Sequence, residues 1–364
     1  MSTIVRIRVA VTLLIVIAVG ALGGQPSAAR GASVLAAQAS GHWVAQDSMT
    51  ASTMHGIACP SATVCYASAA QGIIVGTTNG GRTWNSLLSG VDAGVWAISC
   101  PSAGRCIAGS ESSFHILLTR DGGRTWDLAY QPPLTSNDQF DSDGTNNYYF
   151  RGMYGATCAT ASTCFIVGTI GHIFRTADGG AHWSIQAGEY GQATQASGTS
   201  RQSIMSDVSC LSASVCYAVG FICNCSVPYH VLTAGAIAVS TDGGRSWRSR
   251  TVANVIQSVN CLDVRTCVAV GLNGVILRTT DGGRTWPSVS NPLSGGKRTL
   301  SQVICMGGSC RAVGDKGSVL LSTDGGQSWG SERVPTTADL DVIACPRANL
   351  CYIGGNGGVI LKGS

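Results

Sequence analysis

Charge is what this sequence has least of. Only 12% of its 364 residues are charged, about half the usual share in soluble domains, and three are glutamate: Glu111, Glu189 and Glu332. The formal net charge is +4, a small excess for a chain of this length. This composition gives no indication of a nucleic-acid partner. The three glutamates also form no recognisable catalytic pattern along the chain.

The sequence also lacks an apolar run long enough to cross a bilayer, which takes roughly 20 residues. Val9 to Leu22 spans 14 residues, follows Arg6 and Arg8, and precedes the small residues Ser27-Ala28-Ala29. This order is typical of a secretory signal peptide. We therefore expect a signal peptide over residues 1–29, a linker over 30–40, and a secreted or extracytoplasmic (cell-envelope) protein with no stable membrane span.

Cysteine and glycine are abundant in contrast, with 16 and 48 residues. Fourteen cysteines form seven local pairs, six spaced Cys-x5-Cys and one spaced Cys-x4-Cys. Zinc is the alternative interpretation, but zinc sites have shorter spacings, further ligands nearby and a cytosolic setting. In an exported chain the pattern predicts one disulfide per repeated unit. The expected bridges are Cys59–Cys65, Cys100–Cys106, Cys158–Cys164, Cys210–Cys216, Cys261–Cys267, Cys305–Cys310 and Cys345–Cys351.

The other two cysteines, Cys223 and Cys225, are separated by one residue and precede Tyr229 and His230. A Cys-x-Cys pair near a histidine could bind a soft metal or carry out redox chemistry. A structural disulfide between Cys223 and Cys225 is the interpretation that we prefer.

An octapeptide with the pattern Ser/Thr-x-Asp-x-Gly-x-x-Trp occurs six times, first at Thr77–Trp84 and last at Ser322–Trp329. The Asp of such a turn accepts hydrogen bonds from the N–H groups that follow it, and the hydroxyl residue adds another. The glycines supply backbone angles that a Cβ would forbid. We assign a structural role to the six residues at the acidic position, which are Asn79, Asp121, Asp178, Asp242, Asp281 and Asp324.

This octapeptide resembles the Asp-box (BNR) repeat of sialidase-like β-propellers. The resemblance covers residues 41–364 and implies that each copy joins the third and fourth strands of a blade without touching substrate. In layout the chain is most similar to propellers of the photosystem II stability/assembly factor type, although their arginine-rich binding patch does not map onto this sequence. The disulfides are not part of the family pattern.

Counting the repeats predicts an all-β, seven-bladed β-propeller of four-stranded antiparallel blades. Seven cysteine pairs indicate seven blades, and the tryptophans recur at spacings close to the 40–45 residues typical of one blade. The last unit stops before a box, whereas Gly41-His42-Trp43-Val44 matches the end of a box and the strand after it. The N-terminal strand is therefore expected to complete the last blade and close the ring.

Three insertions interrupt the repeat, near residues 127–151, 185–205 and 221–234. In a four-stranded blade they all fall at the end opposite the disulfides and boxes, on blades 3 and 4. Long loops on a rigid scaffold commonly bind ligands. We expect a protein or glycan ligand to contact Asp141, Asp143, Tyr148, Tyr149, Arg151, Tyr190, Arg201, Tyr229 and His230.

The first insertion alternates oxygen-bearing side chains with a glycine, which suits Ca²⁺. Calcium held by Asp138, Asp141 and Asp143 is therefore an alternative to a plain polar loop, and no other cofactor is indicated.

Two functions of different class remain open from the sequence. The first is a non-catalytic exported binding or assembly propeller, acting as a monomer. The alternative is a carbohydrate-active enzyme, a glycoside hydrolase of sialidase-like or other type, or a polysaccharide lyase. A glycosidase needs two carboxyl groups at a defined separation, and spacing along the chain does not pair Asp207 or Glu189 with a partner.

Overall fold

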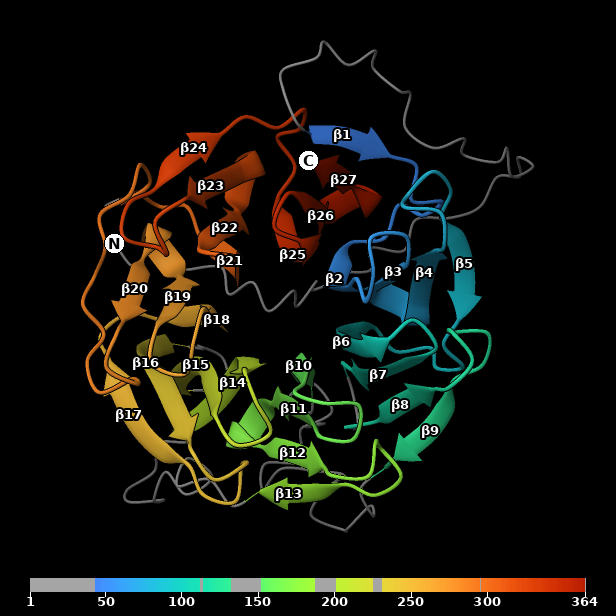
Figure 1. The fold of residues 1–364 in the computed structure, drawn as a ribbon, viewed down its shortest axis with the longest axis horizontal. Helices are drawn as coiled ribbons and strands as arrows, with labels where there is room; N and C mark the ends of the chain where they lie inside the picture. The colour runs from blue at the N-terminus through green and yellow to red at the C-terminus, as the bar shows by residue number, and fades with distance from the viewer. Residues whose placement is uncertain are drawn as a thin grey trace, which may run out of the picture. The chain divides into compact units, whose positions relative to one another are not determined.

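Seven antiparallel β-sheets lie around a common axis in the computed structural model (Figure 1). The structure describes residues 43–111, 114–131, 152–186, 201–224, 231–294 and 296–363. Each sheet is one blade, and its strands follow chain order from the axis outwards except in the last blade, whose outermost strand is the first in the chain. The predicted all-β, seven-bladed propeller is confirmed.

Six of the seven blades take their strands consecutively from the chain, and the last combines its two ends. The innermost strands are β2 (Met54–Ala58), β6 (Val95–Ser102), β10 (Met153–Cys158), β14 (Arg201–Cys210), β18 (Ile256–Cys261), β21 (Leu300–Met306) and β25 (Leu340–Arg347). The second strands are β3 (Cys65–Ala69), β7 (Arg105–Ser110), β11 (Cys164–Gly168), β15 (Cys216–Asn224), β19 (Cys267–Gly271), β22 (Ser309–Gly314) and β26 (Leu350–Gly355). The third strands are β4 (Ile73–Thr77), β8 (Ile116–Thr119), β12 (Ile173–Thr176), β16 (Val231–Ser240), β20 (Ile276–Thr279), β23 (Ser318–Ser322) and β27 (Ile360–Gly363). The outermost strands are β5 (Asn85–Leu88), β9 (Asp127–Tyr130), β13 (Ser184–Gln186), β17 (Arg248–Val252), β24 (Gly330–Glu332) and β1 (Trp43–Gln46).

The strand β1 closes the ring. It pairs with β27, Trp43 opposite Gly363, so the last blade combines the two ends of the described chain. The Trp43 side chain is 6% exposed, and a Cβ at Gly363 would lie 2.6 Å from its ring. This confirms the predicted closure, in which the N-terminal strand completes the last blade and covers the edge of β27.

The core lies between neighbouring blades rather than in one central layer. One cluster combines Met54 and Trp84 of the first blade with Tyr352 of the last. Another combines Val270 of the fifth blade with Ala312 of the sixth. Because the two middle strands of a blade are covered on both sides, they are almost continuously apolar, as in Cys267–Gly271.

The repeated octapeptide, here called the box turn, links the third and outermost strands. In the fifth blade Thr279 Oγ1 donates to Asp281 Oδ1 at 2.8 Å, while Thr285 N and Oγ1 donate to the two oxygens of Asp281 at 3.0 and 2.7 Å. Gly283 N donates to Thr279 Oγ1 at 3.0 Å. Both carboxylate oxygens of Asp281 therefore accept hydrogen bonds from residues of the same turn.

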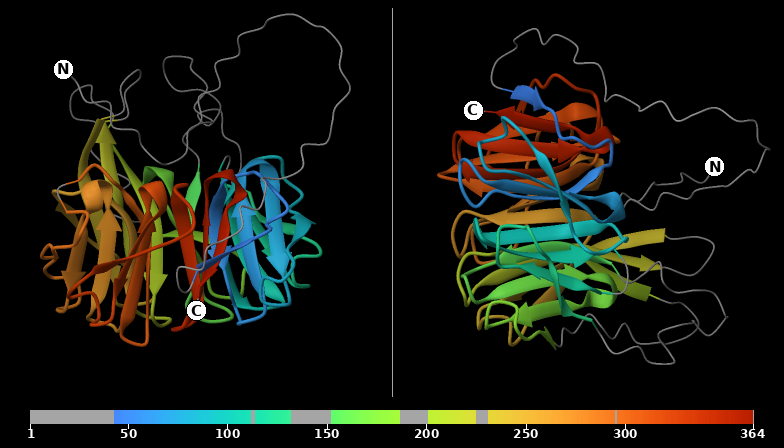
Figure 2. Two further views of the ribbon diagram at one scale, coloured as in Figure 1. Left: turned by 90° about the horizontal axis from the view of Figure 1, so that it is seen from above. Right: turned by 90° about the vertical axis from the view of Figure 1, so that its right-hand side faces the viewer.

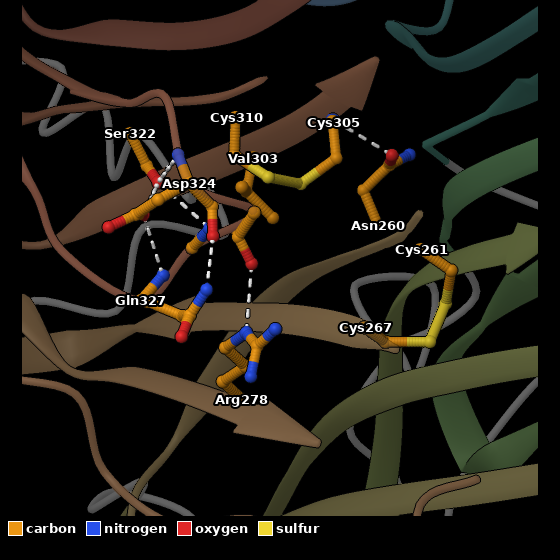
Figure 3. Close-up of a disulfide and its surroundings, with 12 residues drawn as sticks. Asn260, Cys261, Cys267, Arg278, Val303, Cys305, Cys310, Ser322, Asp324 and Gln327 are labelled. Carbon is orange, nitrogen blue, oxygen red and sulfur yellow. Dashed lines mark hydrogen bonds between the residues drawn. A yellow bond between two sulfur atoms is a disulfide. The ribbon is translucent and has the colours of Figure 1, made fainter. Parts of the chain in front are cut away.

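Adjacent blades are joined through the same turns. The Arg278 Nε of the fifth blade donates to Gly325 O in the box turn of the sixth at 2.8 Å (Figure 3). Lys362 Nζ makes the equivalent bond to Gly80 O at 2.8 Å across the ring closure. The side chain of Asn260 also accepts a bond from Cys305 N at 2.9 Å (Figure 3).

A disulfide crosses the first hairpin of every blade. The seven bridges are Cys59–Cys65, Cys100–Cys106, Cys158–Cys164, Cys210–Cys216, Cys261–Cys267, Cys305–Cys310 and Cys345–Cys351. Cys223 is also disulfide-bonded, and its predicted partner Cys225 lies outside the described residues. The bridges and box turns share one end of the blades, here called the box face.

The opposite end, here called the insertion face, carries the second turn of each blade and the connections between blades. In five blades this turn is a single 3₁₀ turn: η1 (Ala70–Gly72), η4 (Thr169–Gly171), η6 (Leu272–Gly274), η7 (Asp315–Gly317) and η8 (Asn356–Gly358). The fourth blade differs, because β15 and β16 continue past this level and project beyond the ring (Figure 2). No helix long and apolar enough to cross a membrane occurs in the described part of the chain.

The fifth blade differs from the predicted four full strands. Its outermost strand is reduced to a single bridge between Leu277 and Ser288. Pro287 follows the box tryptophan there and has no N–H to donate to a ladder. Its carbonyl still accepts a bond from Arg278 N at 3.0 Å, so the chain follows the blade edge without forming a regular strand.

Candidate functional site

The residues predicted to contact ligand lie almost entirely outside the described part of the chain. These are Asp141, Asp143, Tyr148, Tyr149, Arg151, Tyr190, Tyr229 and His230. Asp138, predicted only as a calcium ligand together with Asp141 and Asp143, also lies outside the described residues, so calcium binding remains a prediction. Arg201 is described only as the first residue of β14. Among the described residues no group of three or more His, Cys, Asp or Glu side chains could hold a metal ion.

The ends of the three predicted insertions are described, and they share the insertion face. Strand β9 ends at Tyr130 and β10 begins at Met153, while β13 ends at Gln186 and β14 begins at Arg201. The third insertion interrupts the projecting hairpin between Asn224 and Val231. Because successive strands of a blade are antiparallel, all three junctions fall at the end away from the disulfides.

A β-bulge occurs at the same place in the innermost strand of every blade, close to the insertion face. The pairing with the second strand shifts by one residue around each of these positions. A bulge bends the strand and re-aims a side chain. The seven bulge residues, here called the axial ring, are His55, Trp96, Tyr154, Ser206, Gln257, Ser301 and Asp341.

Three consecutive members of the axial ring are aromatic and touch one another. The ring centroids of His55 and Trp96 are 5.2 Å apart, and those of Trp96 and Tyr154 are 5.0 Å apart, with tilts of 39° and 40°. Trp96 is 6% exposed, whereas His55 and Tyr154 are half-buried. The three residues, here called the aromatic row, lie on the innermost strands of the first three blades.

Glu111 lies beside the aromatic row. It is the first residue of the second turn of blade 2, and its N–H donates to Gly94 O at 2.7 Å. This turn is one residue longer than its counterparts: six residues separate Gly109 from Ile116, compared with five between the equivalent pair Val167 and Ile173. Because of this extra residue, the turn that begins with Glu111 differs from the 3₁₀ turns found at the same position in five other blades.

The carboxylate of Glu111 and the indole N–H of Trp96 converge on Gly94. A Cβ built at Gly94 would lie 2.6 Å from Glu111 Oε2 and 2.9 Å from Trp96 Nε1. Burial raises the pKa of Glu111, although the N–H of Gly94 opposes this by donating to the carboxylate. Burial, and then the negative charge of Glu111, raise the pKa of Tyr154.

The aromatic row is neutral at physiological pH. Burial lowers the pKa of His55 to about 4, so its imidazole carries no charge above that value. The innermost strands contain no lysine, and their two arginines, Arg201 and Arg347, are the terminal residues of β14 and β25. Apart from these two residues, the innermost strands carry no formal positive charge in the described part of the chain.

Asp207 follows the bulge of the fourth blade and binds the fifth. Its Oδ2 accepts bonds from Ser258 Oγ at 2.6 Å and Val259 N at 3.1 Å, and its Oδ1 accepts one from Val208 N at 2.8 Å. Burial raises its pKa to about 6 against the effect of these hydrogen bonds. Both carboxylate oxygens of Asp207 are therefore occupied by hydrogen bonds within the protein. The bonds from Ser258 and Val259 join the fourth blade to the fifth.

Sequence reasoning missed the axial ring and the setting of Glu111. A signal for the ring is present, because each of its members lies four residues before the first cysteine of its blade. Aligning the chain on the cysteines would have shown three aromatic side chains in consecutive blades at one position of otherwise apolar strands. The extra residue in the second turn of blade 2 is a weaker signal, since it changes the repeat length by one.

Comparisons with known proteins give the fold but no family. No family model and no curated protein matches the sequence. Among solved structures, YCF48 bound to D1 peptide is 18% identical with a TM-score of 0.63, over 90% of this chain and 98% of that one. YCF48 from Cyanidioschyzon merolae is 16% identical with a TM-score of 0.64, over 88% and 98%.

Enzymes are also among the structural neighbours. The GH74 xyloglucanase from Xanthomonas campestris is 13% identical with a TM-score of 0.56, over 82% of this chain and 50% of that one. At such identities the likeness concerns the fold alone, and propellers of one fold carry out many functions.

Proposed function

We propose that this protein is an exported, non-catalytic binding propeller that recognises a protein or glycan on its insertion face. The observation that carries the proposal is the axial ring, where side chains depart from the repeat at the same end of the blades as the three insertions. A further support is the neighbour whose structure contains a bound D1 peptide. The proposal includes the ligand-contacting residues predicted in the insertions.

A carbohydrate-active enzyme is the second candidate, and one observation favours it. Glu111 and Asp207 both have raised pKa values and lie towards the insertion face, and GH74 enzymes share the fold. A glycosidase uses one carboxyl group as acid and the other as base or nucleophile. Asp207 is poorly suited to either part, because its three hydrogen bonds already occupy both oxygens.

Shortening the insertions tests the binding function. We expect shortening of all three insertions, near residues 127–151, 185–205 and 221–234, to the length usual in the other blades to leave the melting temperature nearly unchanged, because the strands on either side keep their pairing. Binding to a partner captured from the native secretome or cell envelope should be abolished. A matched control alters the box face by replacing the exposed Arg82, Arg124 and Arg284 with Ala. Normal binding by the shortened protein, with loss in the control, would show that the functional face is the box face.

A substrate screen separates the two candidates. Sialosides, xyloglucan and uronic-acid polymers cover the glycoside hydrolase and lyase chemistries of the second candidate. The binding function predicts no turnover on any of them. Clear turnover that is lost in Glu111→Gln would replace the first proposal by the second.

Export is proposed on the disulfides and the N-terminal sequence together. Seven bridges in one chain indicate an oxidising compartment. We expect a thiol count close to zero on the denatured, non-reduced protein purified from its native location. A count near 16 would contradict both the disulfide framework and export.

A further inference from the structure

Trp96 holds an unused hydrogen-bond donor next to a carboxylate that forms no ion pair in the described part of the chain. Its side chain is more than nine-tenths buried, and its Nε1–H has no partner among the described residues. Glu111 Oε2 lies on the same side, since both atoms point to the position that a side chain would occupy at Gly94. A buried donor without a partner in the protein is costly unless an ordered water or another bound group satisfies it.

In the second and third blades alone, glycines make room for the side chains that pack beside the bulge. The position two residues before the bulge is Gly94 in blade 2 and Gly152 in blade 3, whereas the other five blades have larger residues there. A Cβ at Gly152 would lie 2.7 Å from the Tyr154 hydroxyl. Both glycines lie immediately before an innermost strand, where a larger residue would displace the side chains of Glu111, Trp96 or Tyr154.

The charge of Glu111 has no counterpart in the described part of the chain. Glu332, in contrast, forms an ion pair with Arg311, whose Nε lies 3.2 Å from Glu332 Oε2. Ionisation is costly for a half-buried carboxylate that has no ion-pair partner, which agrees with the raised pKa of Glu111. A ligand with a positive charge would remove this cost.

Aromatic faces also attract cations. The π-systems of Trp and Tyr carry negative charge on their faces, and a carboxylate beside them adds a direct Coulomb attraction. Stacking on the aromatic row would suit a sugar ring equally well, but a neutral sugar makes no use of the unpaired charge.

We propose that Glu111 and the aromatic row, His55, Trp96 and Tyr154, bind a protonated amine or guanidinium group presented by an extended peptide. This inference rests on the proposed binding function and gives the class of ligand: a polypeptide segment with a lysine or arginine at the ring axis. The peptide carbonyl next to this lysine or arginine would accept a hydrogen bond from the indole N–H of Trp96.

The test uses N-acetyl-lysine N-methylamide as probe, with N-acetyl-norleucine N-methylamide as its uncharged counterpart and cellobiose as a glycan. Titrations of the full-length protein follow the indole N–H resonance of Trp96, assigned by its disappearance in Trp96→Phe. We expect the lysine probe to shift this resonance and the norleucine probe to bind about tenfold more weakly or not at all. Glu111→Gln should weaken the lysine probe by a similar factor.

The matched control is Asp92→Asn, which removes one exposed negative charge from the same face outside the cluster. It should change the affinity for the lysine probe by less than about twofold, because exposed charges are screened. Gly94→Ala provides a second variant that keeps Glu111 and Trp96 but fills the point on which they converge, and it should abolish the shift.

Three results would overturn the inference. They are equal binding of the charged and uncharged probes, binding of cellobiose in preference to the lysine probe, and no binding of the lysine probe at millimolar concentration. Each is distinguishable from failure of the proposed function, because the shortened-insertion variants are tested against the captured partner. If those variants lose the partner while the lysine probe fails, the binding function stands and the ligand class is wrong.

Discussion

At the scale of single residues, two ionisable side chains lie in the wall of the ring with opposite shifts. Burial raises the pKa of Asp207 to about 6 and lowers the pKa of His55 to about 4. Both shifts have the same cause, since burial disfavours the charged form of an acid and of a base alike. Their effects on stability therefore oppose each other over the same pH range.

The signs follow from which state binds the proton. Between pH 4 and 6 the folded protein holds a proton on Asp207 that the unfolded chain has lost, so its contribution to stability decreases as pH rises. Between pH 4 and 6.5 the unfolded chain holds a proton on His55 that the folded protein has lost, so its contribution increases as pH rises. Each contribution amounts to roughly 3 kcal/mol over the range, and in the intact protein they nearly cancel.

Single substitutions should separate the two contributions. In Asp207→Asn the free energy of unfolding should rise between pH 4 and 6.5 more steeply than in the intact protein, by up to about 3 kcal/mol. In His55→Gln it should fall over the same range. Urea denaturation at several pH values measures the slope, which is independent of any constant loss caused by the substitution. Equal slopes in both variants and the intact protein would contradict the assigned shifts.

At the scale of the element, the box turn shows how a local sequence fixes a local structure. Hydrogen bonds to Asp281, led by those from Thr285, hold its pKa below the usual range, and the same pattern recurs in the other acidic boxes. In the first box an amide takes this place: Asn79 Oδ1 accepts from Thr83 N at 3.0 Å, and its Nδ2 donates to Thr83 Oγ1 at 2.8 Å. The turn therefore needs an acceptor of this shape more than it needs the charge.

A pair of substitutions in one box tests this. Asp281→Asn should lower the melting temperature by less than half as much as Asp281→Ala, because the amide keeps the bond to the Thr285 N–H while the methyl group keeps none. We expect the alanine variant to lose on the order of a few degrees. Thermal unfolding followed by circular dichroism measures both. An asparagine variant as unstable as the alanine variant would mean that the carboxylate charge is required.

Local signals explain why blades, box turns and disulfide spacing could be predicted from the sequence. The box turn that joins the third and outermost strands is specified by eight consecutive residues. The cysteine pairs mark the end of the first hairpin in each blade. The axial ring could not be predicted in the same way, because a bulge arises from register between strands and its side chains meet only across blades. His55, Trp96 and Tyr154 are about 40–60 residues apart in sequence, and their contact exists only once the ring has formed. Likewise, Pro287 alone did not indicate how far the outermost strand of blade 5 would be reduced.

At the scale of the whole molecule, the ring depends on one short strand. The last blade takes three strands from the C-terminal end of the chain and only β1 from the other end. Trp43 belongs to the same buried cluster as Val313, Ile353 and Leu361, and the guanidinium of Arg311 lies 6.0 Å from the centre of its ring. Since every blade contacts its two neighbours, loosening this strand should affect more than one blade.

Replacing Trp43 by Ala therefore tests closure. Removing a buried tryptophan costs about 3–5 kcal/mol through lost burial and the cavity that remains. Its matched control is Trp286→Ala, which removes the tryptophan at the same place in the repeat from a blade whose outermost strand is only a single bridge. Trp286 is less buried, so the control should cost less and leave unfolding cooperative. Trp43→Ala should instead broaden the transition, because the unpaired edge of β27 lets the last blade open before the others. Unfolding followed by both far- and near-ultraviolet circular dichroism distinguishes the two cases. If both variants show coincident and equally steep transitions, β1 acts only as the outermost strand of its own blade. The stability of the ring would then not depend on closure by β1.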